Sequence, residues 1–381
     1  MAALPCEILD SAMALGDSWL PLGSGGDPFC SPAFLGAAEH TGAAAADMGW
    51  QARHLALRDS GGEIAALLPL YLRDHSFGDF ARDWGWAGAW QRAGLDYYPK
   101  LVSGIPYTPS PGPRLLVAPG QDRAIWAARL LDAAIAYAGE AGASSWQCLF
   151  VREEDRRLLA EAGLLLRRGV QFHWQQRGYR DFEDFLTGFT SEKRKKLRRE
   201  RRAVAESGLH IEARHGDEID SPLWAAIHRH YTRTFRRYGN HPAFPLDFFT
   251  RAGRALGRQL VVFVARENDA PCASAICYRD DHTLFGRHWG CDRDVPGLHF
   301  ELCYYQGIDY CLAHGLQRFE PGAQGEHKLA RGFEPTDTWS AFWIADRRMR
   351  AAVADFVARE DAAMADYAAE AATHLPFRTG G

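Results

Sequence analysis

The sequence lacks the patterns that mark membrane, secreted and zinc-binding proteins. No apolar run approaches the ~20 residues that a membrane-spanning helix requires. The opening residues MAALPCEILDSAM contain the acidic Glu7 and no basic flank, so they do not resemble a signal peptide. The 8 cysteines form no CxxC pair, which argues against structural zinc and fits reduced thiols. We therefore expect a cytoplasmic protein with no membrane span.

The nearest approach to a metal-binding motif is an HxH pair formed by His228 and His230. On a helix, residues two apart point to different faces, so the pair is poorly placed to share a metal. We expect no metal site. His228, Tyr231 and Phe235 have helical spacing, and we interpret them as part of a hydrophobic core.

What the chain does contain is the composition of a globular protein, with 47% hydrophobic, 24% charged and 12% aromatic residues over 381 positions. That length favours two domains. The formal net charge of -4 conceals a strongly basic segment, because positions 193–202 hold eight basic residues and one glutamate. We predict a helix there, with a thin apolar face made by Leu197 and Val204.

The basic helix allows two interpretations. Cations in a first helical turn are unfavourable by ~0.3–1 kcal/mol each at exposed sites, because they oppose the helix macrodipole. A bound phosphate or RNA backbone would neutralise them. In the other interpretation the basic face is only solvated. Under the first, the predicted donor- or phosphate-binding residues are Lys195, Lys196, Arg198 and Arg199.

Two stretches of the chain repeat one plan. The segment 134–146 recurs at 307–319, and each copy predicts an amphipathic helix, a terminal glycine (Gly142 or Gly315) and a short apolar strand. Upstream, AALLPLYLRDHSFG (65–78) resembles ASAICYRDDHTLFG (273–286). Duplicated α/β domains would account for both matches, and chance similarity is the alternative.

The first half carries an insertion, DYYPKLVSGIPYTPSPGPRLL (96–116), which is rich in Pro, Gly and Tyr. That composition predicts an ordered loop, and long loops often bind ligands. A lid packed on the sheet is the alternative. The predicted substrate-binding residues on this loop are Tyr98, Lys100, Tyr107 and Arg114.

A second candidate loop reads EPGAQGEHKLARGF (320–333). Its glycines, Gly322 and Gly325, would let the backbone approach a ligand closely, and two basic side chains could bind a carboxylate or phosphate. We expect Phe333 to anchor the loop in the core. A surface loop with scattered charge is the alternative. The loop's candidate residues are Glu320, Glu326, His327, Lys328 and Arg331.

These blocks together, with GWQARHLALRD (49–59), SEKRKKLRRER (191–201) and the long segment 286–333, resemble the FemAB-like predicted N-acyltransferases, the DUF482 group, which are relatives of the GNAT superfamily. The resemblance covers nearly the whole chain. It implies an α/β (α+β) protein with tandem duplicated GNAT-like acyltransferase domains and mixed sheets. We place these domains at 1–175 and 176–381, the second one with the basic helix 191–207.

The resemblance also implies a site in the crevice where central strands separate, lined by the loop 320–333. Acyl transfer to an amine needs a base and a stabilised oxyanion, but a direct attack needs no enzyme nucleophile. Glu301 and His299 follow Gly297 at a predicted helix start. We therefore expect Glu301, His327 and Lys328 to be catalytic, and expect the loop and Glu301 to share one crevice. The predicted substrate-binding residues around them are His288, Trp289, His299, Glu320, Glu326 and Arg331.

The choice of acyl donor depends on one motif in which this sequence differs from the wider superfamily. Users of acetyl-CoA carry a Q/R-x-x-G-x-G/A loop that cradles pyrophosphate, but CDRDVPGLHFE (291–301) has only Gly297. We predict an N-acyltransferase acting on an amine of a small molecule or peptide precursor, with no tightly bound cofactor. Aminoacyl-tRNA is favoured slightly over acyl-CoA as donor. The alternative is a non-catalytic module that binds RNA or another anion on the same fold.

Overall fold

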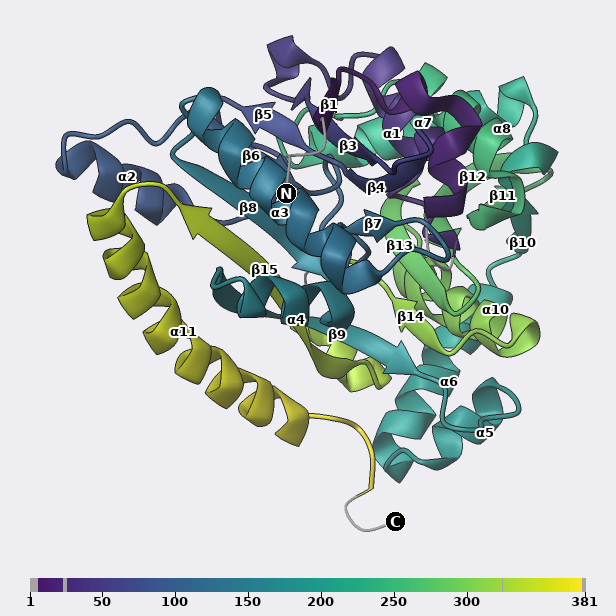
Figure 1. Ribbon diagram of the computed structural model, residues 1–381. Coiled ribbons are helices and arrows are strands. Elements are labelled where there is room, and N and C mark those ends of the chain that lie inside the picture. The colour runs from purple at the N-terminus through teal and green to yellow at the C-terminus, as the bar shows by residue number, and fades with distance from the viewer. Residues whose placement is uncertain (1–5, 23–25, 324, 379–381) are drawn as a thin grey trace. The chain divides into compact units, whose positions relative to one another are not determined.

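The computed structural model describes residues 6–22, 26–323 and 325–378 (Figure 1). They form two compact units: unit 1 takes the described residues up to 169 and residues 337–365, and unit 2 takes the described residues from 170 to 336 and from 366 onward. The chain crosses from one unit to the other inside β9 (Leu165–Gln175), inside β15 (Glu334–Ile344) and inside α11 (Arg347–Thr373). Neither unit is therefore a continuous piece of chain.

Unit 1 contains two sets of paired strands, ordered β1-β3-β4-β7 and β2-β5-β6-β8-β15. The strands pair antiparallel except β6 and β8, which run parallel and are joined through the long helix α3. Apolar side chains of α3, among them Leu130 and Ala134, pack in the core with Leu68 and Trp146 of the strands. The elements before β9 are β1 (Cys6–Leu9), η1 (Ala12–Leu22), α1 (Pro32–His40), η3 (Ala46–Met48), β2 (Gln51–Ala52), β3 (His54–Arg58), β4 (Ile64–Leu68), β5 (Tyr71–Arg73), α2 (Trp84–Arg92), β6 (Lys100–Ser103), β7 (Leu116–Val117), α3 (Arg123–Glu140), β8 (Ser145–Val151) and α4 (Glu153–Glu161).

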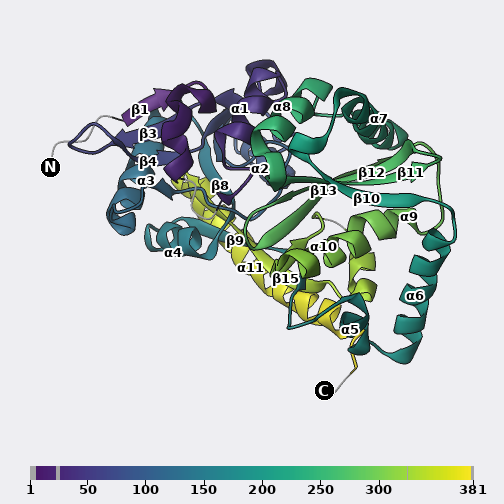
Figure 2. The same ribbon diagram turned by 90° about the vertical axis from the view of Figure 1, so that its right-hand side faces the viewer.

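Unit 2 is built on strands ordered β10-β11-β12-β13-β14-β9. β10 to β13 are antiparallel, β13 and β14 are parallel, and β9 pairs antiparallel with β14. Figure 2 shows α7 and α8 on one face of β10–β13 and α10 on the other. The elements are α5 (Phe182–Thr187), α6 (Ser191–Ala205), β10 (His210–His215), η4 (Gly216–Glu218), α7 (Ser221–Arg237), α8 (Leu246–Leu256), η5 (Gly257–Gln259), β11 (Leu260–Glu267), β12 (Ala270–Arg279), β13 (Thr283–Cys291), α9 (Leu298–Phe300), the π-helical η6 (Glu301–Tyr305), α10 (Gln306–His314), β14 (Arg318–Glu320) and η7 (Glu326–Arg331).

The predicted repetition corresponds to one structural plan in both units. In each unit a strand is connected to its parallel neighbour through a helix and a glycine, as β6–α3–Gly142–β8 with β7 before the helix, and as β13–α10–Gly315–β14 with α9 and η6 before the helix. Both glycines have positive φ, 62° and 70°, a conformation that other residues adopt at a cost. The α/β fold with mixed sheets and a duplicated plan is thus as predicted.

Two sequence expectations differ from the structure. The predicted division at 175/176 lies six positions beyond the crossing at 169/170, and residues 337–365, which we placed in the second domain, belong to unit 1. The supposed loop 96–116 contains the buried strand β6 and the short strand β7. Within the described part of the chain, no helix has the length and hydrophobicity to cross a bilayer, and no cluster of three metal-ligating side chains occurs.

Candidate active site

The candidate active site of unit 2 lies where β13 and β14 separate. The two strands pair only between 283–285 and 318–320, after which β14 ends and β13 continues to Cys291. The pairing of β13 with β12 shifts register so that Arg287 is an extra residue between Gly286 and His288. Bulges of this kind bend a strand and are frequent beside active sites. The separation leaves a cavity of about 230 Å³, which we call the β13/β14 cavity.

The walls of this cavity come from β12, β13, the helical segment after β13 and the loop after β14. Most of the side chains are imidazoles, thiols, aromatic rings or cations. The described lining residues are Ala275, Ile276, Cys277, Gly286, Arg287, His288, Trp289, His299, Cys303, Tyr304, Pro321, Gly322, Ala323, His327 and Lys328.

Lys328 brings a buried ammonium group to the cavity. Its residue is 2% exposed, and Nζ donates a hydrogen bond to the carbonyl of Gly322 at 2.5 Å. Burial lowers the pKa of Lys328 to about 8, although Glu320 acts in the opposite direction. Gly322 and Gly325 have φ of 99° and 110°, so this turn does require glycine. The loop therefore forms an ordered wall of the cavity. Phe333 at its end is fully buried, as expected.

Three histidines line the same cavity; the rings of His299 and His327 lie beside Tyr304, whereas the ring of His288 packs against Tyr231 and Phe249 of α7 and α8. Burial lowers the pKa of His288 to about 3 and that of His299 to about 4. Burial, helped by Lys328 and Arg331, also lowers the pKa of His327. His327 Nε2 lies 2.7 Å from the hydroxyl of Tyr304, whose pKa is raised by burial. All three imidazoles are therefore neutral near pH 7.

Two predicted binding residues of the loop hold other side chains instead of facing the cavity. Glu320 is 1% exposed and forms an ion pair with Arg287 at 2.8 Å. Glu326 is exposed and accepts a hydrogen bond from Tyr367 at 2.9 Å.

Arg331 is buried but also lies outside the cavity lining. Its guanidinium stacks over the ring of Phe300 at 3.4 Å, pairs with Glu200 of α6 at 3.0 Å and donates to Tyr305. It also donates to the backbone carbonyl of His327 at 3.0 Å. Arg331 therefore fixes the backbone that carries Lys328, and its predicted contact with substrate gains no support.

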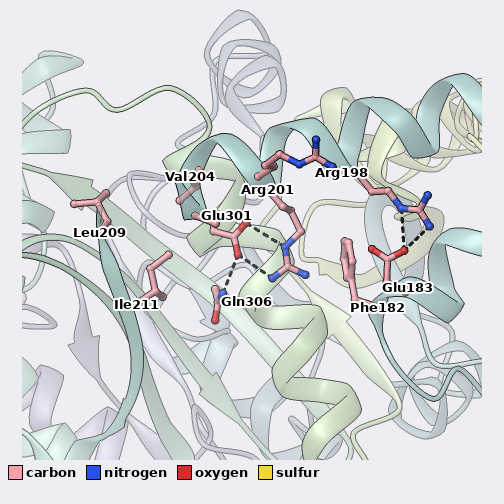
Figure 3. A pocket seen from close by; sticks show the side chains of 11 residues that line it. Phe182, Glu183, Arg198, Arg201, Val204, Leu209, Ile211, Glu301 and Gln306 are labelled. Carbon is pink, nitrogen blue, oxygen red and sulfur yellow. Dashed lines mark hydrogen bonds and ion pairs between the residues drawn. The ribbon is translucent and has the colours of Figure 1, made fainter. Parts of the chain in front are cut away.

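The expectation that Glu301 and Lys328 share one crevice is wrong. Glu301 lies in the π-helical turn and lines a different cavity of about 710 Å³, the Glu301 cavity (Figure 3). Its carboxylate is bound by Arg201 at 3.0 Å and by the amide of Gln306 at 2.8 Å, as Figure 3 shows. Arg201 also pairs with Asp309 at 2.7 Å. Through its ion pair with Arg201, Glu301 therefore connects α6 to the helical segment after β13.

A third cavity of about 830 Å³ adjoins the β13/β14 cavity, because Trp289 and His299 line both. We call it the arginine cavity. Sequence reasoning missed it, since we interpreted the end of α7 as core; the run TFRRYG was the available signal. Arg237 pairs with Asp294 and Arg293 with Glu267. Its charged lining residues are Arg233, Arg236, Arg237, Arg293, Asp292 and Asp294.

The basic helix α6 has the thin apolar face that was predicted, since Leu197 and Val204 are buried. The four predicted phosphate-binding residues, Lys195, Lys196, Arg198 and Arg199, are all exposed. Arg198 pairs with Glu183 at 2.5 Å. Three exposed cations therefore remain beside this pair.

The predicted binding residues of unit 1 serve its interior. Lys100 lies on β6, is 0% exposed and contacts Asp79 at 2.8 Å and Asp83 at 2.5 Å. Arg114 is also 0% exposed and donates to the backbone carbonyls of Leu149 and Ser110. Buried charges need such partners. Lys100 and Arg114 are thus unavailable to a ligand, contrary to prediction.

Two further predicted residues are half-buried in the same unit. The hydroxyls of Tyr98 and Ser76 lie 2.9 Å apart, and the Tyr107 ring packs near Trp50 with centroids 5.6 Å apart. Both contacts are internal to unit 1, so they give no support to the prediction that these tyrosines bind substrate.

Comparisons with known proteins agree with this architecture. The FemX crystal structure has a TM-score of 0.54 at 12% identity, over 91% of this chain and 100% of that one. The C-terminal domain of a protein named as a lysylphosphatidylglycerol synthetase from Agrobacterium fabrum gives 0.53 at 11%, over 90% and 94%. L-PGS from Bacillus licheniformis gives 0.51 at 11%, over 84% and 90%. At these identities the likeness establishes the fold.

No curated protein matches the sequence significantly. The profile of the FemAB-like family, described as peptidoglycan biosynthesis/recognition, matches residues 14–379. The chain therefore belongs to the FemAB-like family.

Proposed function

We propose that this protein is an acyltransferase that moves an acyl or aminoacyl group onto an amine in the β13/β14 cavity. The observation that carries the proposal is the buried ammonium of Lys328 at a cavity opened by the separation of two parallel strands. Ligands of α/β proteins bind beyond the carboxyl ends of such strands. Membership of the FemAB-like family supports the same chemistry.

The reaction is a direct attack. The amine nitrogen adds to the donor's carbonyl carbon, and Lys328 stabilises the negative charge that develops on the carbonyl oxygen. A neutral imidazole takes the proton that the amine loses. We assign this role to His327, because it lines the cavity and its ring is oriented by Tyr304. Collapse of the intermediate expels the donor's oxygen or sulfur, which recovers that proton.

Aminoacyl-tRNA is our preferred donor. The β13/β14 cavity of about 230 Å³ suits an acyl group better than a nucleotide, so we assign the nucleotide to the adjoining arginine cavity. Guanidinium groups there suit phosphate oxygens. The exposed cations of α6 extend the surface available to a polyanion. A small-molecule or peptide amine is the acceptor.

The first experiment measures transfer by the purified protein from aminoacyl-tRNA or acyl-CoA to model amines. Lys328→Ala is expected to lower kcat by roughly 10²–10³, the usual effect of removing an oxyanion-stabilising group. Arg254→Ala removes an exposed cation of α8 and serves as the matched control. Undiminished transfer by Lys328→Ala would contradict the proposal, and salt-sensitive RNA binding without any transfer would favour the binding module.

The second experiment identifies the donor surface. Neutralising Lys195, Lys196, Arg198 and Arg199 together should flatten the dependence of log K on log salt, by about 0.7 for each lost contact with single-stranded phosphate. Arg233→Ala with Arg236→Ala tests the arginine cavity in the same way. Tight binding of acetyl-CoA that is indifferent to both sets would instead identify acyl-CoA as the donor.

A further inference from the structure

The β13/β14 cavity combines two cations with no acidic wall. None of its described lining residues is Asp or Glu. Of its two cations, Arg287 is paired with Glu320, a side chain that is 1% exposed and does not line the cavity. The Lys328 ammonium donates a hydrogen bond to the backbone carbonyl of Gly322, which carries no formal charge. The walls therefore have a net positive charge.

The other polar groups of the cavity do not offset this charge. His288, His299 and His327 are neutral near pH 7, and Tyr304 keeps its proton. Imidazole nitrogens can accept hydrogen bonds, but they supply no counter-charge. An unpaired cation taken from water into such a site is strongly disfavoured and gives up its proton instead.

Building on the proposed function, we propose that the β13/β14 cavity selects a donor whose acyl side chain is uncharged and rejects one that carries an ammonium group, such as lysyl. The α-amine of an aminoacyl ester is a lesser obstacle. An α-amino group has a pKa of about 7.7–8.0, so it enters without its proton at small cost near pH 7.5, whereas a lysyl side chain has a pKa of about 10.4.

This difference predicts the size of the selection. At pH 7.5 only about one lysyl side chain in 10³ is uncharged. Selectivity for an uncharged donor should therefore approach roughly 10³, and it should fall about tenfold for each unit by which the pH is raised. Loss of the Lys328 proton at high pH lowers both rates and also removes the net positive charge of the cavity, so it narrows the gap between the two donors in the same direction.

The test compares alanyl-tRNA with lysyl-tRNA as donors to one acceptor, using the full-length protein at pH 6.5, 7.5 and 8.5. We expect kcat/KM for alanyl-tRNA to exceed that for lysyl-tRNA by at least about 100-fold at pH 7.5, with the gap closing as the pH rises. Equal use of the two donors, or a preference that ignores pH, would overturn the inference while leaving the proposed transferase activity intact.

A second test adds a negative charge to the cavity and asks whether the lysyl donor is then accepted. Ala323→Glu places a carboxylate on the cavity wall, at a half-buried loop position, and should raise the use of lysyl-tRNA at least about tenfold. Ala270→Glu makes the same charge change at an exposed position of β12 and should leave the preference unchanged. No gain for Ala323→Glu in a protein with an unchanged melting temperature would count against the inference.

If no donor supports transfer, the proposed function fails, and selection is read from binding alone. Norleucine methyl ester and lysine methyl ester have side chains of similar length and differ in charge. Titration calorimetry should then show tighter binding of the norleucine ester, by at least about tenfold at pH 7.5. Equal binding of the two esters would overturn the inference independently of any activity.

Discussion

At the scale of single residues, the buried lysine sets the pH range over which the cavity can act. The pKa of Lys328 is lowered by burial to about 8, and only its protonated form stabilises an oxyanion. That form predominates below pH 8 and is lost above it. A pH profile of kcat should therefore fall above about pH 8. Lys328→Arg keeps the charge to a higher pH, so any activity it retains should show no fall in that range. A wild-type rate that stays constant to pH 10 would contradict the assignment.

Gly290 on β13 determines how closely α7 packs on that strand. A Cβ atom at this position would lie 1.9 Å from the backbone carbonyl oxygen of His230, and a backbone atom cannot move aside as a side-chain end can. We expect Gly290→Ala to lower the free energy of unfolding by about 1–3 kcal/mol, the range for overpacking. Chemical denaturation measures this change.

The matched control is Gly139→Ala, at an exposed position of α3 where an added Cβ meets nothing within 4 Å. Alanine has the better helix propensity, so this change should stabilise by about 0.5–1 kcal/mol. Equal effects of the two substitutions would show that the contact with α7 is not limiting.

At the scale of elements, one ion pair joins α6 to η7, the segment that carries the proposed reacting groups. Glu200 of α6 binds Arg331 of η7 at 3.0 Å, and Arg331 in turn holds the carbonyl of His327. We expect Glu200→Gln to loosen this segment and lower kcat about tenfold. Exposure of Lys328 to water would raise its pKa, so the fall in the pH profile should move to higher pH.

Glu192→Gln, an exposed change in the first turn of the same helix, is the control for this prediction. A purely structural role for Glu200 would lower the melting temperature without moving the pH profile. A shifted profile with a nearly normal melting temperature is the result that identifies a positioning residue.

Helical spacing explains why one part of the site was predictable and another was not. His299, Cys303 and Tyr304 line the β13/β14 cavity, as residues four or five apart on a helix can. Glu301 is two positions after His299 and therefore faces away, the same rule that separates His228 from His230. The loop 320–333 could be located from its glycines and charges. Its partners on α6 could not, because an ion pair over more than a hundred residues leaves no local pattern.

In unit 1, the sequence-based prediction failed for the segment 96–116. The Pro- and Gly-rich composition of 96–116 predicts a loop, but the four residues of β6 are buried, including Lys100. Composition over twenty residues does not resolve a strand of four, and a buried lysine is rare unless it is paired. The partners Asp79 and Asp83 lie on a different segment, so sequence alone favoured exposure.

At the scale of the whole molecule, the units cannot be separated by one cut. Ending the chain at residue 175 removes 337–365 from unit 1, and with it β15, the partner of β8. We expect a 1–175 fragment to lack cooperative unfolding and to aggregate through the exposed edge of β8. Size-exclusion chromatography and thermal melts of the fragment check this. A soluble monomer with a sharp transition would contradict it.

The crossing of the chain at β15 has a consequence for its biosynthesis. β8 leaves the ribosome about 190 residues before its partner strand, which at 5–20 residues per second is a delay of roughly 10–40 s. Throughout that interval one edge of a strand of sequence SWQCLFV has no β15 to pair with. Unit 1 therefore cannot close until residues 337–344 have been synthesised, and the edge of β8 stays without this partner in the nascent chain until then.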